Sequence, residues 1–444
     1  MAYLNICIVF ASLGIIASAS FPNVYPRIKN EKLNGDPGVP LFLTPLIEQN
    51  KIKDAQDAAQ VHFNGFKNIK SFAGYLTVDK GFDSNMFFWF FPSQTDYTNA
   101  PVLLWLQGGP GASSLIGLFA EHGPFIVKPK HGLKLRPYAW TKTHSVLYID
   151  NPVGTGYSFT NKGNAQNETK VGESYAGKYV PAIAYTIHQN NPSAKIKINL
   201  QGLSIGNGLC DPEHQLKYGD YLYQIGLIDL NTQQLVKNFE QQGIKYIQNK
   251  DFAKAFEVFD SLLNGDMNNH SSVFKNSTGF DNYFNFLYPI DPNDAEIKLL
   301  GAYVQRNDIR AAIHVGNTTF NGIAQDVETN LLTDVMQSVA PWISDLLESY
   351  RVLIYNGQLD IIVAYPLTVN FLQNLKFSGA DQYKTAKRLK WFVAGEIAGY
   401  VKQAGNLTEI LVRDAGHMVP ADQPQWAFDM ISRFTRNKPF QKSQ

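Results

Sequence analysis

The sequence predicts an α/β fold with an open sheet at its centre. Two continuous apolar runs, Pro101–Leu106 and Ser145–Asp150, each end in a glycine-containing turn. Continuous apolarity is typical of strands that helices bury on both faces. Runs of this kind alternate with helical stretches, which predicts the fold class. With 444 residues and 44% hydrophobic content, the chain can bury a large core in one domain with insertions or in two domains.

The first residues have the pattern of a secretory signal. A short apolar run over residues 6–16 precedes Ala17-Ser18-Ala19, which has the small-x-small form of a signal-peptidase site. We therefore expect residues 1–19 to be a signal peptide. A membrane anchor is the weaker interpretation, because about eleven apolar residues cannot cross roughly 30 Å of hydrocarbon. No later segment has a spanning length.

Five Asn-x-Ser/Thr sequons fit passage through the secretory pathway, to a secreted or lysosomal destination. They are Asn167, Asn269, Asn276, Asn317 and Asn406. Cys7 lies in the expected signal, so the mature chain would keep Cys210 alone and have no internal disulfide. A large core must then supply the stability.

The charge balance argues against some classes of partner. The chain has 39 basic and 38 acidic residues, a formal net charge of +1. This balance gives no bulk electrostatic reason to expect a nucleic acid or an anionic membrane. The glycine-rich turn after Leu106 lacks the Gly-Lys-Ser/Thr ending of a phosphate loop. No metal or cofactor is predicted, and the oligomeric state stays open.

The remaining sheet elements follow from β-prone runs. Residues 71–78 and 85–91, separated by a Lys80-Gly81 turn, predict an antiparallel hairpin. Further strands are expected at residues 195–203, 351–355 and 409–412.

A mainly helical cap insertion is expected at residues 212–341, between two parts of the sheet domain at 20–211 and 342–444. Asp251 can cap a helix that Gly265 ends, and residues 308–315 give another short helical pattern. The first of these helices has one apolar face, formed by Phe252, Phe256, Phe259 and Leu263.

The stretch from Gly172 to Gly177 is a candidate nucleophile elbow, with Ser174 held between small residues. In such an elbow a strand runs through a strained turn into a helix and exposes the serine hydroxyl. The helix is expected from Lys178 onward. Its buried face would carry Val180, Ile183, Ala184 and Ile187.

Two further strand ends carry groups that could activate this serine. Asp360 follows the run at 351–355, and His417 follows the run at 409–412. A serine needs an imidazole to take its proton, and the imidazole needs a carboxylate to orient it. Taken singly, Asp360 is most often a turn former and His417 a structural histidine. The chain order Ser174, Asp360, His417 is that of the α/β-hydrolases and favours the catalytic interpretation.

The turn Gln107-Gly108-Gly109-Pro110-Gly111 has two interpretations. A glycine-rich loop alone is weak evidence and could be only a flexible turn. Because it follows an expected buried strand and precedes the elbow, it also suits an oxyanion hole, in which backbone N–H groups approach the developing charge closely.

At these motifs the chain resembles the serine carboxypeptidases, and within them the vitellogenic carboxypeptidase-like branch. The resemblance covers about residue 72 to the C-terminus. The motifs that carry it are Trp105 to Gly111, Asp150 to Gly156, Gly172 to Tyr179, Ile205 to Gly208 and Gly416 to Pro420. The branch is indicated by the stretch from Pro40 to Ile47 and by Gln107 in place of the commoner asparagine.

The resemblance implies an exopeptidase that removes C-terminal residues from peptides or proteins. Ser174 would be the nucleophile, His417 the base and Asp360 its orienting carboxylate. The N–H groups of Gly109 and Tyr175 would form the oxyanion hole.

The resemblance also implies a subsite for the terminal carboxylate of the substrate. Gln107, Gly108 and Glu173 would hold it, with Glu121 hydrogen-bonded to Glu173. An anion can bind beside two glutamates only if they share protons, since like charges raise a carboxylate's pKa. We therefore expect peptide binding to favour acidic pH. For Glu121 alone, a solvated loop glutamate is the competing interpretation.

The chain departs from this family just before the elbow. Only residues 160–171 separate Phe159 from Gly172, and their apolar residues are Ala165 and Val171. A parallel crossover unit takes roughly 30 residues. We therefore expect this chain to lack the helix and central strand that precede the serine in the family.

Three functional interpretations follow. The first is an active serine carboxypeptidase. The alternative is a catalytically impaired, truncated or splice-variant relative with a binding or storage role. Acyl transfer on the same serine is weaker, because it requires the exclusion of water and nothing in the sequence indicates that.

Overall fold

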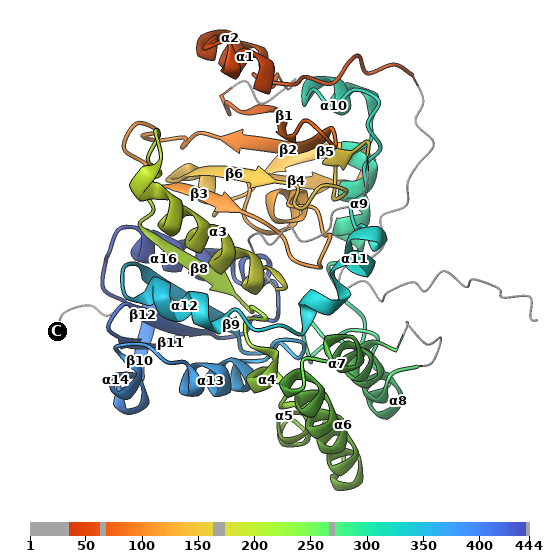
Figure 1. Cartoon of the computed structure of the whole chain (residues 1–444), viewed down its shortest axis with the longest axis vertical. Helices are drawn as coiled ribbons and strands as arrows, with labels where there is room; N and C mark the ends of the chain where they lie inside the picture. Colours follow the sequence, from red (N-terminus) through yellow and green to blue (C-terminus); the bar gives the residue numbers. More distant parts are fainter. Residues whose placement is uncertain (1–34, 63–67, 163–173, 266–270, 441–444) are drawn as a thin grey trace, which may run out of the picture.

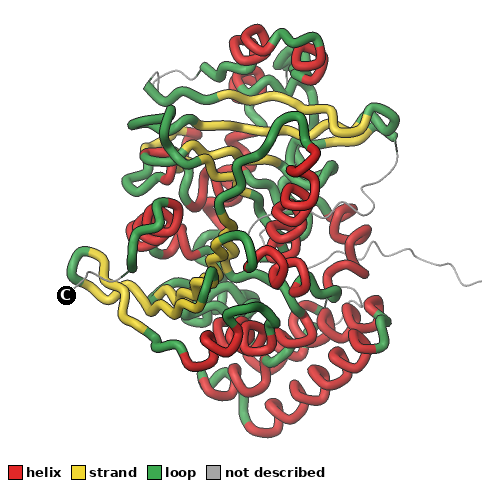
Figure 2. The backbone as a smooth tube through the Cα atoms, turned by 60° about the vertical axis from the view of Figure 1, so that its left-hand side comes forward, coloured by secondary structure: helices red, strands yellow, loops and turns green. Residues whose placement is uncertain are grey.

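The structure is a computed structural model that describes residues 35–62, 68–162, 174–265 and 271–440. In these ranges the main strands form two five-stranded sheets with helices around them (Figures 1 and 2). The predicted α/β class is therefore confirmed. No helix in the described ranges is both long and apolar enough to cross a membrane. The expected signal peptide, residues 1–19, lies outside them.

The first sheet has the strand order β1-β2-β6-β3, and β7 pairs with β2 beside this path. The strands are β1 (Phe72–Asp79), β2 (Ser84–Phe91), β3 (Val102–Trp105), β6 (Ser145–Ile149) and β7 (Phe159–Thr160). Strands β1 and β2 form the predicted antiparallel hairpin, whereas β3 and β6 pair in parallel. A separate ribbon joins β4 (Phe125–Lys128) to β5 (Gly132–Leu135).

The second sheet has the order β10-β11-β12-β9-β8. Its strands are β8 (Gly202–Gly206), β9 (Arg351–Gly357), β10 (Leu389–Val393), β11 (Glu396–Ala404) and β12 (Leu407–Val412). Strand β9 pairs in parallel with both β8 and β12. All six residues of β12 are buried. The centre of this sheet is thus the kind of covered parallel strand that continuous apolar runs predict.

Helices occupy the connections and cover the sheets. They are α1 (Thr44–Glu48), α2 (Ile52–Ala58), η1 (Gly117–Glu121), η2 (Pro129–His131), η3 (Trp140–Lys142), α3 (Ala176–Asn190), η4 (Asn191–Ser193), α4 (Pro212–Gln215), α5 (Tyr218–Gln224), α6 (Leu230–Gln248), α7 (Phe252–Phe259), η5 (Asp260–Asn264), α8 (Val273–Thr278), α9 (Asp294–Val304), α10 (Asn307–Ala312), α11 (Gln325–Val335), α12 (Ala340–Leu347), α13 (Tyr365–Asn374), α14 (Ala380–Thr385), α15 (Val419–Asp422) and α16 (Pro424–Thr435).

Helices α5 to α8 gather at one end of the molecule, beyond the second sheet (Figure 1). The helix predicted after Asp251 is α7 continued by η5. Asp251 accepts a hydrogen bond from the Lys254 N–H, and Gly265 ends the segment with a φ of 81°. These are the capping and stop signals that the sequence contains.

Two strand expectations are wrong. They concern β3 and β8, the edge strands through which the two sheets face each other in Figure 1. Strand β3 is not buried on both faces, because Val102 is 68% and Leu104 38% exposed. Residues 195–201 are not a strand, and Ile196 and Ile198 are exposed at 85% and 54%. The physical reason is that β3 and β8 are edge strands, so nothing among the described residues pairs with their outer edges.

The buried face of α3 also differs from the expectation. Tyr179, Ala182 and Ala184 are buried, whereas Val180 and Ile183 are only partly covered. Helix α3 packs mainly against β8 and α12 and makes no comparable contact with β3. Among the strands, its main partner is therefore β8.

Asp150 connects the turn after β6 to the turn after β3. Its Oδ1 accepts from the Ser113 hydroxyl (2.6 Å) and the Ser114 N–H (3.0 Å), and its Oδ2 accepts from the Tyr157 N–H (2.8 Å). The side chain is buried, which raises the pKa of Asp150 from 3.8 to about 6. The folded state therefore holds a proton here that the unfolded chain releases near pH 4.

This pKa predicts a pH dependence of stability. Asp150 contributes stability below pH 4 and loses it as pH rises through 6, a change of at most about 3 kcal/mol. We expect Asp150→Asn to have a lower free energy of unfolding than the unchanged protein, measured in urea between pH 4 and 7. Its free energy of unfolding should, however, decline less as the pH rises. An unchanged decline in the variant would contradict the assignment.

Gly357 allows the ends of β9 and β12 to approach closely. It pairs with Val412, and the next turns stay joined because the Leu359 N–H donates to the Ala415 carbonyl at 2.8 Å. A Cβ at Gly357 would lie 1.9 Å from the carbonyl oxygen of Gly416. Any larger residue must therefore separate the two strand ends.

We expect Gly357→Ala to lower the free energy of unfolding by about 2 kcal/mol or more, because the added methyl meets backbone that cannot move freely. The measurement is chemical unfolding of the purified protein. Gly132→Ala in β5 is the control, since a Cβ there meets nothing within 4 Å. Equal free energies of unfolding for the two variants would show that the ends of β9 and β12 leave room for a methyl group at Gly357.

Candidate active site

Ser174 stands just before helix α3 in a strained turn. Its φ of 67° lies in the left-handed region, which a non-glycine residue keeps only when its surroundings hold it there. Its N–H donates to the Gly206 carbonyl at the end of β8 (3.3 Å), and its carbonyl accepts from the Leu209 N–H (2.9 Å). A Cβ at Gly177 would lie 2.7 Å from the Leu209 nitrogen. The turn is thus attached to the end of β8.

Asp360 and His417 form a fully buried pair. His417 Nδ1 lies 3.0 Å from Asp360 Oδ2, and both side chains are 0% exposed. A carboxylate only accepts hydrogen bonds, so Nδ1–H donates and Nε2 is left as the basic nitrogen. Asp360 follows β9 and His417 follows β12, and these parallel neighbours end at the same edge of the sheet. The structure therefore brings these two predicted residues together.

Two residues that hold this pair were not assigned a role from the sequence. Asn207 Nδ2 donates to Asp360 Oδ2 (2.7 Å), and Asn207 has a positive φ of 41° at the end of β8. The Phe284 ring stacks on the His417 ring with centroids 5.0 Å apart. The Gly-Asn-Gly motif at a strand end was a usable signal for Asn207. No local signal marks Phe284, which reaches the site from the loop after α8.

The structure does not join Ser174 to His417. Nε2 of His417 is buried and has no hydrogen-bond partner among the described residues, so the Ser174 hydroxyl does not contact it there. Catalytic hydrogen bonds are often long before substrate binds. The arrangement is therefore a hydrogen-bonded Asp360–His417 pair, with the predicted nucleophile Ser174 in a strained turn outside hydrogen-bond distance of His417.

Gly109 and Tyr175 both line a pocket that contains Ser174. Gly109 has a φ of 109°, and a Cβ there would lie 2.8 Å from the Ala112 nitrogen. Neither backbone N–H has a hydrogen-bond acceptor within the described part of the chain. Two available N–H groups beside a serine hydroxyl can stabilise an oxyanion.

The expected carboxylate subsite is partly described. Gln107 is buried, and its side chain accepts from Trp105 Nε1 (3.0 Å) and donates to Glu121 Oε1 (3.0 Å). Glu121 is 0% exposed, which excludes a solvated loop glutamate. The Gly108 carbonyl accepts from the Ala112 N–H. Glu173 lies outside the described residues.

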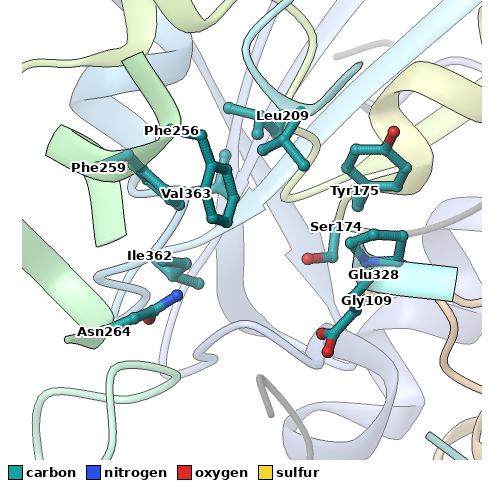
Figure 3. Close-up of a pocket in the computed structure, with 12 residues that line it drawn as sticks. Gly109, Ser174, Tyr175, Leu209, Phe256, Phe259, Asn264, Glu328, Ile362 and Val363 are labelled. Atoms are coloured by element: carbon teal, nitrogen blue, oxygen red, sulfur yellow. The ribbon is translucent and has the colours of Figure 1, made fainter. Parts of the chain in front are cut away.

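The pocket beside Ser174 is mostly apolar. Figure 3 shows Ser174 and Tyr175 on one side and Phe256, Phe259 and Ile362 on the other. The complete lining is Gly109, Pro110, Ser174, Tyr175, Leu209, Phe256, Phe259, Asn264, Glu328, Val335, Ile362 and Val363. Three elements of the predicted cap, α7, η5 and α11, thus contribute to the lining.

Three sequon asparagines fall within the described residues. Asn276, Asn317 and Asn406 are all exposed. Asn167 and Asn269 lie outside the described ranges. Accessibility at the three described positions is compatible with modification.

Comparisons with known proteins cover almost the whole chain. The family model described as serine carboxypeptidase matches residues 61–171 and 170–437. A venom serine carboxypeptidase from Apis mellifera is 54% identical, with 95% of this chain and 96% of the relative covered. The vitellogenic carboxypeptidase of Aedes aegypti is 45% identical over 90% of this chain and 91% of the relative.

Among solved structures, the prohormone-processing carboxypeptidase Kex1 of Saccharomyces cerevisiae superimposes with a TM-score of 0.71. The match covers 86% of this chain and 96% of that one at 23% identity, which supports the fold alone. The fold is that of the α/β-hydrolases. Taken with the family match and the relatives, this makes the chain a member of the serine carboxypeptidase family.

Proposed function

We propose that this chain releases C-terminal residues from peptides through an acyl-enzyme on Ser174. The observation that carries the proposal is the buried Asp360–His417 pair in a chain of the serine carboxypeptidase family. The strained turn at Ser174, with a φ of 67°, adds to it, because a nucleophile elbow holds its serine in such a turn. No finding supports the alternative of a binding or storage role.

In the proposed reaction, Ser174 Oγ attacks the carbonyl carbon of the last peptide bond while its proton passes to His417 Nε2. The Asp360 carboxylate stabilises the imidazolium. The N–H groups of Gly109 and Tyr175 donate to the oxyanion. The C–N bond then breaks, and His417 protonates the departing amine. Water repeats these steps on the acyl-enzyme and releases the shortened peptide.

The substrate's terminal carboxylate would be held by Gln107, Gly108 and Glu173, with Glu121 behind them. The contact between Gln107 and the buried Glu121 supports this, because it orients the Gln107 amide. A buried glutamate near a substrate anion is tolerable only when protonated. We therefore propose an acidic optimum for peptides.

We also propose that the chain lacks a helix and a strand before Val171. The family match falls into two parts that meet at residues 170–171. The alignment with the Apis mellifera relative is 451 residues long although this chain has 444 and is 95% covered, so that relative has residues without counterparts here. The outer edges of β3 and β8 are the position at which a strand ending in Ser174 would pair.

The proposed cap comprises residues 212–341, inserted between sheet parts at 20–211 and 342–444. Its Phe256 and Phe259 lie in the pocket wall opposite Ser174, which supports a role in covering the site. The expected signal at residues 1–19 and the sequons support passage through the secretory pathway, to a secreted or lysosomal location. The names of two relatives refer to venom and to vitellogenesis.

We expect a serine-directed organophosphorus probe to modify the purified protein at Ser174, because the nearby histidine can activate its hydroxyl. The measurement is peptide mapping by mass spectrometry. Ser174→Ala should abolish the modification.

A second protein with a strand and helix restored before Val171 should react faster, since a supported elbow places the serine better; a displacement of about 1 Å can cost on the order of 100-fold. Modification of the restored protein alone would mean that this form is inactive. Modification of neither would contradict the catalytic assignment.

We expect kcat/KM on a peptide to fall between pH 5 and pH 7, because ionised glutamates repel the substrate's terminal carboxylate. Glu121→Gln should reduce this decline. A C-terminally amidated peptide is the control, since it carries no terminal charge. A flat profile for the free acid would contradict the shared-proton subsite.

A further inference from the structure

The hydroxyl of Tyr175 is anchored outside the pocket. It donates to the carboxylate of Asp334, near the end of helix α11. Tyr175 is 3% exposed, and its ring packs edge-on against that of Tyr179, with centroids 4.8 Å apart. Burial raises the pKa of Tyr175 well above its ordinary value, so the hydroxyl stays a donor. Because Tyr175 follows Ser174 directly, fixing its ring restricts the peptide between them.

Lys178 makes a second connection to the same place. It is fully buried, and its ammonium donates to the carbonyls of Asp334 (2.9 Å) and Gln337. These carbonyls lie at and just beyond the C-terminal end of α11, where a cation is favoured by the helix dipole. A buried ammonium is costly unless hydrogen-bonded. Two carbonyls and the nearby Asp334 carboxylate supply this compensation.

The charge of Lys178 is maintained at the acidic pH proposed for the enzyme. Burial lowers the pKa of Lys178 to about 8, and the nearby Asp334 and Asp211 carboxylates oppose that shift. Cys210 also faces it, but burial raises the pKa of this thiol, so it stays neutral. The connection is therefore intact under mildly acidic conditions.

Helix α11 also forms part of the pocket. Its Glu328 and Val335 line the space that contains Ser174. Figure 3 shows Glu328 and Tyr175 on the same side of the pocket as Ser174. The contacts of Tyr175 and Lys178 thus join the turn that carries the nucleophile to a wall of its pocket.

We propose that Asp334 and Lys178 are positioning residues. Asp334 holds the Tyr175 side chain and thereby fixes the Tyr175 backbone N–H relative to Ser174. Lys178 fixes the end of α11, and with it a wall of the pocket. This rests on the proposed function, in which that N–H stabilises the oxyanion. The transition state needs this placement more than the bound substrate does. Loss of the connection should therefore lower kcat and leave KM nearly unchanged. If the two residues served stability alone, kcat of the folded variants would stay the same.

The test uses Tyr175→Phe, Asp334→Ala and the double variant. Tyr175→Phe keeps the ring and the backbone N–H, and Asp334→Ala keeps the carbonyl that Lys178 binds. We expect each to lower kcat about 10-fold with KM within about twofold, and the double variant to lose no more than either alone. Asp334→Asn, which keeps an acceptor, should recover part of the loss.

Tyr179→Phe is the matched control. Tyr179 lies one helical turn away, and its hydroxyl has no hydrogen-bond partner in the described part of the chain. This variant should keep the kcat of the unchanged protein. Lys178→Met should lower kcat further than Tyr175→Phe, because it releases the end of α11 as well.

The outcomes separate this inference from the proposed function. Unchanged kcat in Tyr175→Phe and Asp334→Ala, with an active parent, would overturn the positioning role. Additive losses would show that the two residues act independently and would also overturn it. An inactive, unlabelled parent would contradict the proposed function instead. In that case a double-mutant cycle on the thermal stability of the same variants decides whether Tyr175 and Asp334 are coupled, and additive changes would overturn the positioning role.

Discussion

The site depends on the parallel pairing of β9 with β12. Each strand ends in a turn that carries one member of the Asp360–His417 pair, so the register of the two strands fixes the distance between a carboxylate and an imidazole. The turns approach so closely that no side chain fits at Gly357. Asn207, directly after β8, donates a further hydrogen bond to the same carboxylate oxygen. Three adjacent strand ends thus determine the geometry of the groups that we propose as base and orienting carboxylate.

Ser174, the proposed nucleophile, is held in a different way. Ser174 is attached to the end of β8 by backbone hydrogen bonds and to α11 by Tyr175 and Lys178. Among the described residues, no strand supports it from the side of β3. A turn with an unfavourable backbone angle needs rigid surroundings, because strain persists only where neighbouring contacts outweigh it. The contacts with α11 therefore matter more here than they would in a continuous sheet.

Buried polar groups connect the parts of the molecule that the sheet does not. Asp150 joins two turns of the first sheet, Gln107 joins Trp105 to Glu121, and Lys178 joins α3 to α11. Each group has hydrogen-bond partners, from the backbone for Lys178, from backbone and side chain for Asp150, and from side chains for Gln107. That placement offsets the cost of burying a charge or an amide. It also makes the turns around the pocket sensitive to single substitutions.

The sequence by itself determined the fold class and the family, and it predicts the catalytic roles of Ser174, Asp360 and His417. Their order along the chain is visible in the sequence, and so are the apolar runs before Asp360 and His417. Only the tertiary structure decided that β3 and β8 are edges and that Phe284 stacks on His417. It also decided that Tyr175 and Lys178 bind the C-terminal end of α11. Local patterns report burial and turns, but the partner of a strand edge or ring depends on residues far away in the chain.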